Sequence, residues 1–312
     1  MDQSQLRIAI LLPCYNEEAA IARTVAGFRA ALPGAVVYVY DNNSSDRTSE
    51  LAAAAGAIVR TERMQGKGHV VRRMFADVDA DVYVMADGDS TYDSAAAPEL
   101  VARLIDERLD MVVGARNSQV EEAYRRGHRL GNRLFTSILS GLFGRSFTDI
   151  FSGYRIFSRR FVKSFPALSR GFETETEISV HALELAMPVA EVVTAYGARP
   201  EGSQSKLSTW HDGWRIMRTI LHLFRIERPV LFYGSFGLVL ALVAIVLAAP
   251  LVVTYVHTGL VPRFPTAILV TGLMIVAFMS FMCGLILDTV VRGRREVRRL
   301  AYLALPPPGG GA

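Results

Sequence analysis

The sequence has few cysteines and no strong excess of charge of either sign. Two cysteines among 312 residues exclude a disulfide-stapled scaffold, and a hydrophobic fraction of 51% excludes disordered and collagen-like chains. The formal net charge of +4 is too small to argue for a nucleic-acid partner, and no basic stripe with interleaved aromatic residues occurs. We expect no signal peptide, because the amino-terminal segment starts acidic and its apolar run is short.

Two nucleotide-binding signatures are also missing. The first apolar segment is not followed by GxGxxG, which disfavours an NAD-dependent oxidoreductase, and no GxxxxGK[ST] loop occurs. Gly66-Lys67-Gly68 follows a short apolar segment but completes neither pattern. Its glycines permit a close backbone approach, and Lys67 could meet an anion.

Charge is absent from two long segments, residues 230–256 and 266–287. Each is long enough to cross a bilayer, which takes roughly 20 apolar residues. The first would be about 40 Å long as a helix, so it must tilt or kink, and Pro250 is the expected kink point. Arginine clusters flank the pair on both outer sides, and the positive-inside rule then places both flanks in the cytoplasm. A pair of buried core helices is the alternative.

The first 200 residues alternate β-branched apolar runs with helical periodicity. The apolar runs are RIAILLP, VVYVYD, AIVRT, DVYVMAD and DMVVGAR, and Ile21, Val25, Phe28 and Leu32 share one helix face between the first two. This alternation predicts an α/β fold with a mostly parallel sheet. Residues 214–226 have the pattern of an amphipathic helix on a membrane surface, or of a linker helix packed on the soluble domain.

The cysteines fall in different parts of this plan. Cys14 lies in the soluble segment and Cys283 in the second apolar segment, so we expect no bridge and a reducing compartment. We expect four regions: a catalytic domain (1–208), a juxtamembrane helix (209–229), a two-helix anchor (230–290) and a basic tail (291–312).

Acidic side chains follow two of the expected strands. Asp87 and Asp89 are separated by one small residue after a buried run, and Asp41 ends an earlier strand. Ligands bind beyond the carboxyl ends of parallel strands, and like charges this close repel one another. A divalent cation would remove the repulsion, and carboxylate oxygens suit Mg²⁺ or Mn²⁺. Asn16 is expected to cap the helix after the first strand.

Six motifs in order resemble one family. They are LPCYNEE, DNNSSDRT, DGDSTY, GAR, DIFSGYRIF and RPEGSQSKL, and together they resemble the family 2 glycosyltransferases of GT-A fold, in the polyprenyl-phosphate glycosyltransferase branch. The resemblance covers about residues 7–208, and the two apolar segments match membrane-anchored bacterial members. It implies a GT-A, Rossmann-like sheet followed by an amphipathic interfacial helix and two transmembrane helices.

The resemblance also implies roles for individual residues. The metal would be held by Asp87 and Asp89. The nucleotide sugar would be bound by Pro13, Tyr15, Glu17, Asp41, Lys67, Asp87, Gly88 and Arg116. The acceptor phosphate would be bound by Arg129, Ser152, Arg155 and Lys206. Asp149 matches the position proposed as catalytic base, with Arg129 and Arg155 beside it in the catalytic group. Thr91 stands where some relatives carry a glutamine metal ligand, and Asn42 stands where many carry a second aspartate.

The implied reaction is inverting, metal-dependent transfer of a hexose from a nucleotide-diphosphate sugar to a polyprenyl phosphate. UDP-glucose is the first expected donor and GDP-mannose the second, with Mg²⁺ or Mn²⁺ as cofactor. We expect a multi-pass inner- or plasma-membrane protein, a tetramer by analogy, with its catalytic domain and carboxyl terminus in the cytoplasm. The alternatives are transfer to another membrane acceptor, a processive polysaccharide synthase, which usually carries a QxxRW motif absent here, and an inactive nucleotide-binding scaffold.

Overall fold

The computed structural model describes residues 6–116, 147–169, 171, 173–198, 218, 221, 224–226 and 228–308. The chain divides into two compact units. One comprises Met1–Asp212 together with Arg298–Ala312, and the other is Gly213–Val297. The first unit therefore includes the end of the chain, which had been expected as a separate tail.

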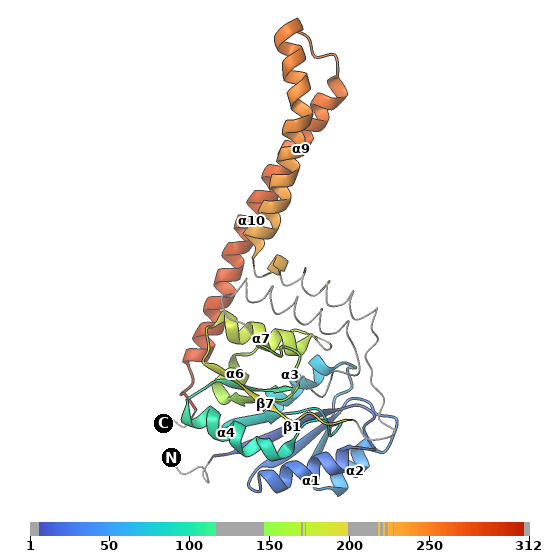
Figure 1. Ribbon diagram of the computed structural model, residues 1–312, viewed down its shortest axis with the longest axis vertical. Helices are drawn as coiled ribbons and strands as arrows, with labels where there is room; N and C mark the ends of the chain where they lie inside the picture. Colours follow the sequence, from blue (N-terminus) through green and yellow to red (C-terminus); the bar gives the residue numbers. More distant parts are fainter. Residues whose placement is uncertain are drawn as a thin grey trace. The chain divides into compact units, whose positions relative to one another are not determined.

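A seven-stranded mixed sheet forms the centre of the first unit, in the order β3-β2-β1-β4-β6-β5-β7 (Figure 1). Its strands are β1 (Ile8–Cys14), β2 (Val36–Asp41), β3 (Ile58–Thr61), β4 (Val82–Met85), β5 (Met111–Arg116), β6 (Arg155–Ser158) and β7 (Val189–Thr194). Only β6 runs antiparallel to its neighbours β4 and β5. The expected mostly parallel α/β sheet is thus confirmed, and the five apolar runs of the sequence are its first five strands.

Helices cover both faces of this sheet (Figure 1). One face carries α1 (Ile21–Ala31), α2 (Thr48–Ala54) and α4 (Ala97–Asp106), which follows the short 3-10 helix η2 (Ser94–Ala96). The other face carries α3 (Lys67–Asp77), α6 (Arg159–Ser164) and α7 (Thr174–Glu184). Strands covered on both faces need apolar side chains in both directions, and all four residues of β4 are buried accordingly.

The core under α1 is the one that the helical periodicity predicts. Ile21, Val25 and Phe28 are buried and pack with the apolar side chains of β1 and β2. Phe28 also meets the ring of Tyr154 edge-on, with the centroids 6.0 Å apart. This packing fixes the carboxyl ends of β1 and β4, because α1 begins just after the loop that leaves β1.

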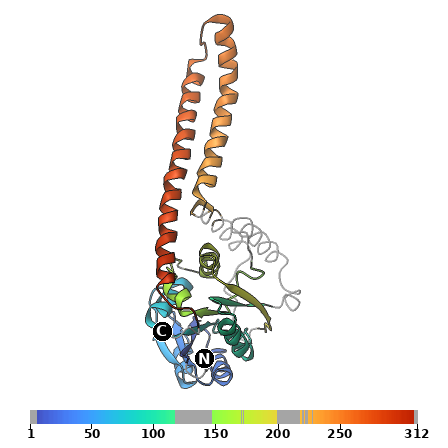
Figure 2. The ribbon, with the colours of Figure 1, turned by 90° about the vertical axis from the view of Figure 1, so that its left-hand side faces the viewer.

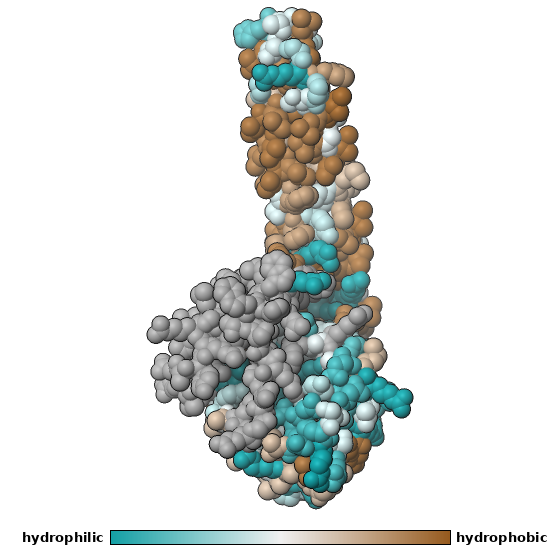
Figure 3. Space-filling model, turned by 90° about the vertical axis from the view of Figure 1, so that its right-hand side faces the viewer, coloured by the Kyte–Doolittle hydropathy of each residue, from teal (hydrophilic) through white to brown (hydrophobic). Residues whose placement is uncertain are grey.

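The second unit contains α9 (Pro229–Thr258) and most of α10 (Phe264–Leu303), which lie side by side in Figures 1 and 2. Both helices are long and apolar enough to cross a membrane, with hydropathies of 2.9 and 2.3 in their most apolar windows. Hydrophobic residues cover much of their outer surface in Figure 3. The backbones approach closely where Gly237 faces Ala277, and the Ser280 hydroxyl donates to the Tyr233 carbonyl at 2.8 Å.

The two helices differ from the expected segments in length. The first continues through Pro250 without interruption, and α10 runs to Leu303 instead of ending near residue 290. The basic stretch that follows the apolar part is helical because no proline occurs in it, and Asp288 and Arg292 form an (i, i+4) ion pair there at 2.6 Å. Cys14 and Cys283 are both free, as expected.

The end of the chain contributes to the first unit through a buried carboxylate at the amino end of β5. Asp110 has a fully buried side chain, which pairs with Arg160 at 2.5 Å and accepts from Ser158 Oγ at 2.7 Å. Tyr302 Oη donates to its Oδ2 at 2.8 Å, and the Arg160 guanidinium lies 4.6 Å from the Tyr302 ring centroid. Burial, together with the hydrogen bond to Asp110, raises the pKa of Tyr302 to about 12, so the hydroxyl stays a donor.

We predict that Asp110→Asn destabilises the first unit by at least about 3 kcal/mol, because it leaves a buried guanidinium without its counter-charge. Tyr302→Phe removes one hydrogen bond and should cost only about 1 kcal/mol. Thermal and denaturant unfolding of the full chain in detergent measures both. Glu50→Gln, which breaks an exposed ion pair with Arg47, serves as the control. Equal stabilities for the Asp110 variant and this control would contradict the prediction.

Candidate functional site

The candidate site lies at the carboxyl edge of the sheet, where the strand order turns. From β1 the chain passes outward to β2 and β3 and then returns to the other side of β1 as β4. The loops that leave β1 and β4 therefore part in opposite directions, which is the place where open α/β sheets bind ligands. Asp41 ends β2, Asp87 and Asp89 follow β4, and Arg116 ends β5. Four of the residues predicted from sequence thus come from three strand ends at this edge.

Asp87 is paired with a lysine. Its Oδ1 lies 2.5 Å from the ammonium of Lys67, the first residue of α3, and this ammonium also contacts Glu175 Oε1 in the first turn of α7. Burial alone would lower the pKa of Lys67, but the charges of Asp87 and Glu175 outweigh it and raise the pKa well above the usual range. Lys67, predicted to bind the donor, therefore reaches the site as the counter-ion of two carboxylates.

Asp89 is oriented by Thr91. The Thr91 hydroxyl donates to Asp89 Oδ1 at 2.6 Å, and the Thr91 amide donates to the same oxygen at 3.1 Å. Asp89 is only 2% exposed. Between the two aspartates, Gly88 lies against the Cys14 sulfur, where a Cβ would not fit. Thr91 thus fixes the orientation of a candidate metal ligand by two hydrogen bonds.

The donor set fits a metal that is shared with a diphosphate. Within the described part of the chain no group of three or more His, Cys, Asp or Glu side chains could hold an ion. Mg²⁺ is commonly held by one or two carboxylates, with substrate phosphates and water completing its six oxygens. Gly153 leaves space for one of these carboxylates, because a Cβ there would come within 2.6 Å of Asp87 Oδ2. The two aspartates are therefore suited to such a site and not to an all-protein cage.

The loop after β2 is held by amide side chains. Asn42 Nδ2 donates to the carbonyls of Glu62 and Met64 at 2.9 and 2.8 Å, and its Oδ1 accepts from Gly66 N at 2.7 Å. Asn42 thus holds the turn that presents Lys67. Asp41 is 6% exposed and accepts from Ser44 N at 3.3 Å.

The loop after β1 carries the remaining predicted donor residues. Pro13 is in β1, the exposed Tyr15 follows it, and Glu17 is buried with its amide donating to Thr48 Oγ1 at 2.8 Å. The expected cap role of Asn16 is wrong. Helix α1 begins five residues later, and Asn16, in the left-handed region with φ 52°, accepts from Ser45 N at 2.8 Å instead. It joins the loops after β1 and β2.

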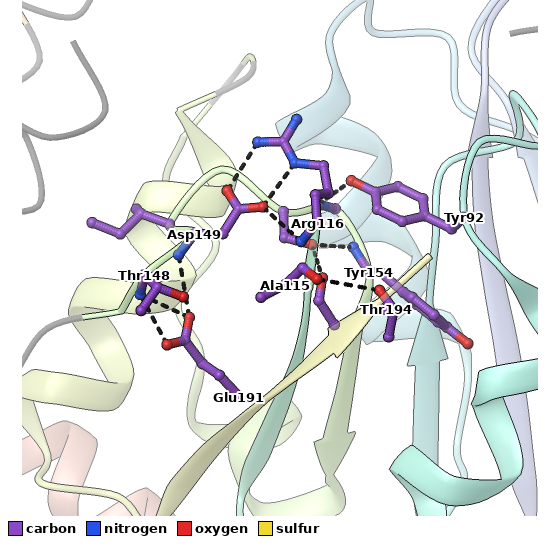
Figure 4. A network of polar contacts seen from close by, with 12 residues as sticks. Tyr92, Ala115, Arg116, Thr148, Asp149, Tyr154, Glu191 and Thr194 are labelled. Carbon is purple, nitrogen blue, oxygen red and sulfur yellow. Dashed lines mark hydrogen bonds and ion pairs between the residues drawn. The ribbon is translucent and has the colours of Figure 1, made fainter. Parts of the chain in front are cut away.

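On the other side of the site, Arg116 and Asp149 form a bidentate ion pair (Figure 4). The guanidinium Nε and Nη2 lie 2.7 and 2.9 Å from the two carboxylate oxygens, and the Arg116 amide adds a bond of 3.2 Å. Arg116 also lies over the Tyr196 ring, 5.5 Å from its centroid. Burial would raise the pKa of Asp149, but hydrogen bonds and charge from Arg116 outweigh it and lower the pKa. Asp149 is therefore ionised and a weak base.

Glu191 on β7 fixes the segment that carries Asp149. Its carboxylate accepts from Thr148 N at 2.9 Å and from Asp149 N at 3.2 Å (Figure 4). Tyr92 Oη accepts from Gly153 N at 2.8 Å and so holds the other end of this loop. The backbone around Asp149 is thus tied both to β7 and to the segment after Asp89.

Ser152 and Arg155 make hydrogen bonds to backbone carbonyls of the protein. Both are fully buried. The Ser152 hydroxyl donates to the Gly114 carbonyl at 2.6 Å, and the Arg155 guanidinium donates to the carbonyls of Ser152 and Ile150 at 2.9 and 2.5 Å. Burial lowers the pKa of Arg155 to about 10. Direct contact of these two side chains with an acceptor phosphate stays a prediction, while their visible role is to brace the loop. Arg129 and Lys206 lie outside the described residues.

Sequence reasoning missed two carboxylates, Glu175 and Glu191. Each lies in a segment with no recognised motif, on α7 and β7. A signal was available for Glu191, because VAEVVT is a β-rich run with one charge in its centre. For Glu175, one of three glutamates in FETETE, the sequence gives no reason to prefer it over its neighbours.

Comparison with known proteins identifies the family. Residues 9–165 match glycosyl transferase family 2. Glycosyltransferase AglJ of Haloferax volcanii is 31% identical over 93% of this chain and 95% of its own. A dolichyl-phosphate hexose transferase of the same organism is 28% identical over 71% of this chain and 95% of its own. This chain belongs to glycosyl transferase family 2, and it is a glycosyltransferase.

The fold agrees with this assignment. Glucosyl-3-phosphoglycerate synthase from Mycobacterium tuberculosis, crystallised with Mn²⁺, UDP-glucose and phosphoglyceric acid, superposes with a TM-score of 0.58. The match covers 70% of this chain and 80% of that chain at 22% identity. The sheet is therefore of the GT-A kind predicted from the motifs.

We predict that Gly153→Ala lowers glycosyltransferase activity by at least about tenfold, because the added methyl group forces Asp87 out of its position. Initial rates of sugar-nucleotide turnover measure this loss. The matched control is Gly34→Ala in the first unit, where a Cβ would meet nothing within 4 Å. Equal rates for the two alanine variants would show that the position of Asp87 is not critical.

Proposed function

We propose that this glycosyltransferase moves a hexose from a nucleotide-diphosphate sugar to a polyprenyl phosphate held in a bilayer. The observation that carries the proposal is the combination of a dolichyl-phosphate hexose transferase among the relatives with two helices able to cross a membrane in the same chain. A prenyl chain cannot leave the bilayer, so an enzyme that uses it needs a membrane-attached catalytic unit. The Mn²⁺ and UDP-glucose bound by the similar crystal structure favour UDP-glucose with a divalent cation.

In this proposal Asp87 and Asp89 hold the cation, which would neutralise the diphosphate and so make the nucleoside diphosphate a better leaving group. The loops after β1 and β2, with Tyr15, Glu17 and Asp41, take the nucleoside. Thr91 keeps one carboxylate of the pair in a single orientation, and Gly153 leaves room for the other.

The acceptor enters on the Arg116 side. A phosphate oxygen of the polyprenyl phosphate forms a bond to the anomeric carbon while the bond from that carbon to the diphosphate breaks, with inversion. The phosphate needs positive charge. Arg116, which the sequence assigned to the nucleotide sugar, supplies it in this proposal, with Arg129 and Lys206 as further predicted contacts. Asp149 fixes the guanidinium in place through two hydrogen bonds.

Transfer to a lipid phosphate is tested with the full chain in nanodiscs, radiolabelled UDP-glucose or GDP-mannose, undecaprenyl phosphate and Mn²⁺. We expect label in a lipid product that mild acid releases, and loss of activity by at least about 100-fold on chelation or in Asp87→Asn and Asp89→Asn. Label in an acid-stable lipid would favour a different membrane acceptor. Hydrolysis of the donor without any lipid product would overturn the acceptor assignment.

We predict that Asp149→Asn retains turnover within about tenfold of wild type at pH 8, because an alkyl phosphate has a second pKa of about 6 and is already ionised there. Since the pKa of Asp149 is lowered, the carboxylate keeps its charge throughout pH 5–8, and no acid limb of the rate profile in that window belongs to it. Arg116→Gln breaks the same ion pair but also removes the positive charge assigned to the acceptor, so we expect it to lower turnover more than Asp149→Asn does. A loss of about 1,000-fold in Asp149→Asn, well beyond that of Arg116→Gln, would instead establish a general base.

A further inference from the structure

One buried ion cluster at the site has two members, Lys67 and Glu175, that the mechanism above does not use. It is the chain of charges from Asp87 through Lys67 to Glu175. Lys67 has only 10% of its side chain exposed, and Glu175 has 6%. A buried carboxylate is costly unless it is paired, so Glu175 needs a physical reason for its place.

The two helix ends explain why Lys67 needs this partner. Lys67 is the first residue of α3, whose first turn has no acidic residue, and a cation at a helix amino terminus is opposed by the helix dipole. Glu175 is in the first turn of α7, where the dipole favours an anion. The two helices approach closely here, since Gly68 lies so near the Ser169 carbonyl and Thr174 Oγ1 that a Cβ would not fit. Lys67 and Glu175 are thus presented to each other by rigid elements.

The two carboxylates that bind Lys67 differ in the surroundings of their second oxygen. Glu175 binds Lys67 through Oε1, whereas its buried Oε2 has no hydrogen-bond partner among the described residues. Asp87 meets the same ammonium through Oδ1 and turns Oδ2 toward Gly153. The Lys67 ammonium is therefore shared by two carboxylates, of which only Asp87 belongs to the expected metal site.

A lysine that is paired with only one carboxylate of a metal site would weaken binding of the metal cation. Like charges that lie a few ångströms apart repel one another, and the repulsion is stronger where little water separates them. An ammonium paired with Asp87 alone would cancel that carboxylate and repel an incoming divalent cation. A second carboxylate on the same ammonium offsets the charge of the lysine, so that less of this charge acts on Asp87 and on the cation.

We infer that Glu175 is a positioning residue that tunes metal affinity, because it shares Lys67 with Asp87 and so keeps Lys67 from neutralising the metal site. This inference rests on the proposed function, since it assumes a divalent cation at Asp87 and Asp89. Glu175 itself does not touch the cation in this account. It acts through Lys67, and its effect depends on that lysine.

The test is a titration of the full chain in nanodiscs with Mn²⁺ alone, followed by the electron paramagnetic resonance signal of free Mn²⁺. We expect Glu175→Gln to raise the Mn²⁺ Kd by at least about fivefold and Lys67→Met to lower it by a similar factor. In the Lys67→Met background the effect of Glu175→Gln should fall within about twofold, since the lysine that transmits it is gone.

Glu177→Gln is the matched control. It removes a carboxylate from the same turn of α7, one that accepts from the amides of Leu168 and Ser169 at 2.8 Å and does not contact Lys67. Its Mn²⁺ Kd should stay within about twofold of wild type. Thermal unfolding of each variant separates a loss of folded protein from a change in affinity.

Each outcome decides between the two proposals. If Glu175→Gln binds Mn²⁺ like wild type, or if its effect persists unchanged without Lys67, the inference is overturned while sugar transfer by the wild type still supports the proposed function. A wild-type chain with no affinity for Mn²⁺ also overturns the inference. In that case the assay of sugar transfer to undecaprenyl phosphate, done with the wild-type chain, tests the proposed function separately.

Discussion

Carboxylates gathered at a poorly solvated sheet edge repel one another, and the architecture of this site follows from the way that repulsion is relieved. Three carboxylates of the site show how this is done. Asp87 has Lys67, Asp149 has Arg116, and Glu191 has the backbone amides of the segment before the loop. The partners come from elements that are distant in sequence, so pairing the charges also brings the loops of the sheet edge together.

The two sides of the site use the same arrangement with different cations. Lysine, a compact point charge, stands beside the aspartates that suit a metal, where it can be shared between two carboxylates. Arginine, a planar fork, meets Asp149 with two parallel bonds and lies over an aromatic ring, which fixes its plane. Anionic substrates thus meet cations whose positions are already set, and little reorganisation is required when they bind.

The sequence predicts the fold of the first unit well because both signals involved are local. Buried strands read as apolar runs, and the face of α1 reads as a period of 3.6 residues. The strands β6 and β7 were not recognised, and β6 is short and begins at Arg155, the last residue of the SGYR motif. The extent of α10 was underestimated, because charged residues that end an apolar run do not end a helix.

Positions in the site were predicted better than contacts. Motifs placed Asp41, Asp87, Asp89, Arg116 and Asp149 at one sheet edge or beside it, since strand ends are readable from sequence. What each side chain touches depends on tertiary neighbours that no local pattern encodes. Lys67 meets a residue from α7, Arg155 turns inward to loop carbonyls, and Asn16 bridges two loops instead of capping a helix.

The bond between Asp110 and Tyr302 links residues 192 positions apart, with α9 and nearly all of α10 between them in the sequence. A ribosome makes the amino-terminal part first, so Asp110 must remain without its final partner until the last turns of α10 have been synthesised. Completion of the sheet unit is thereby coupled to completion of the chain. A nascent copy stalled within the apolar helices would carry an unfinished charge cluster, which quality-control proteases could recognise.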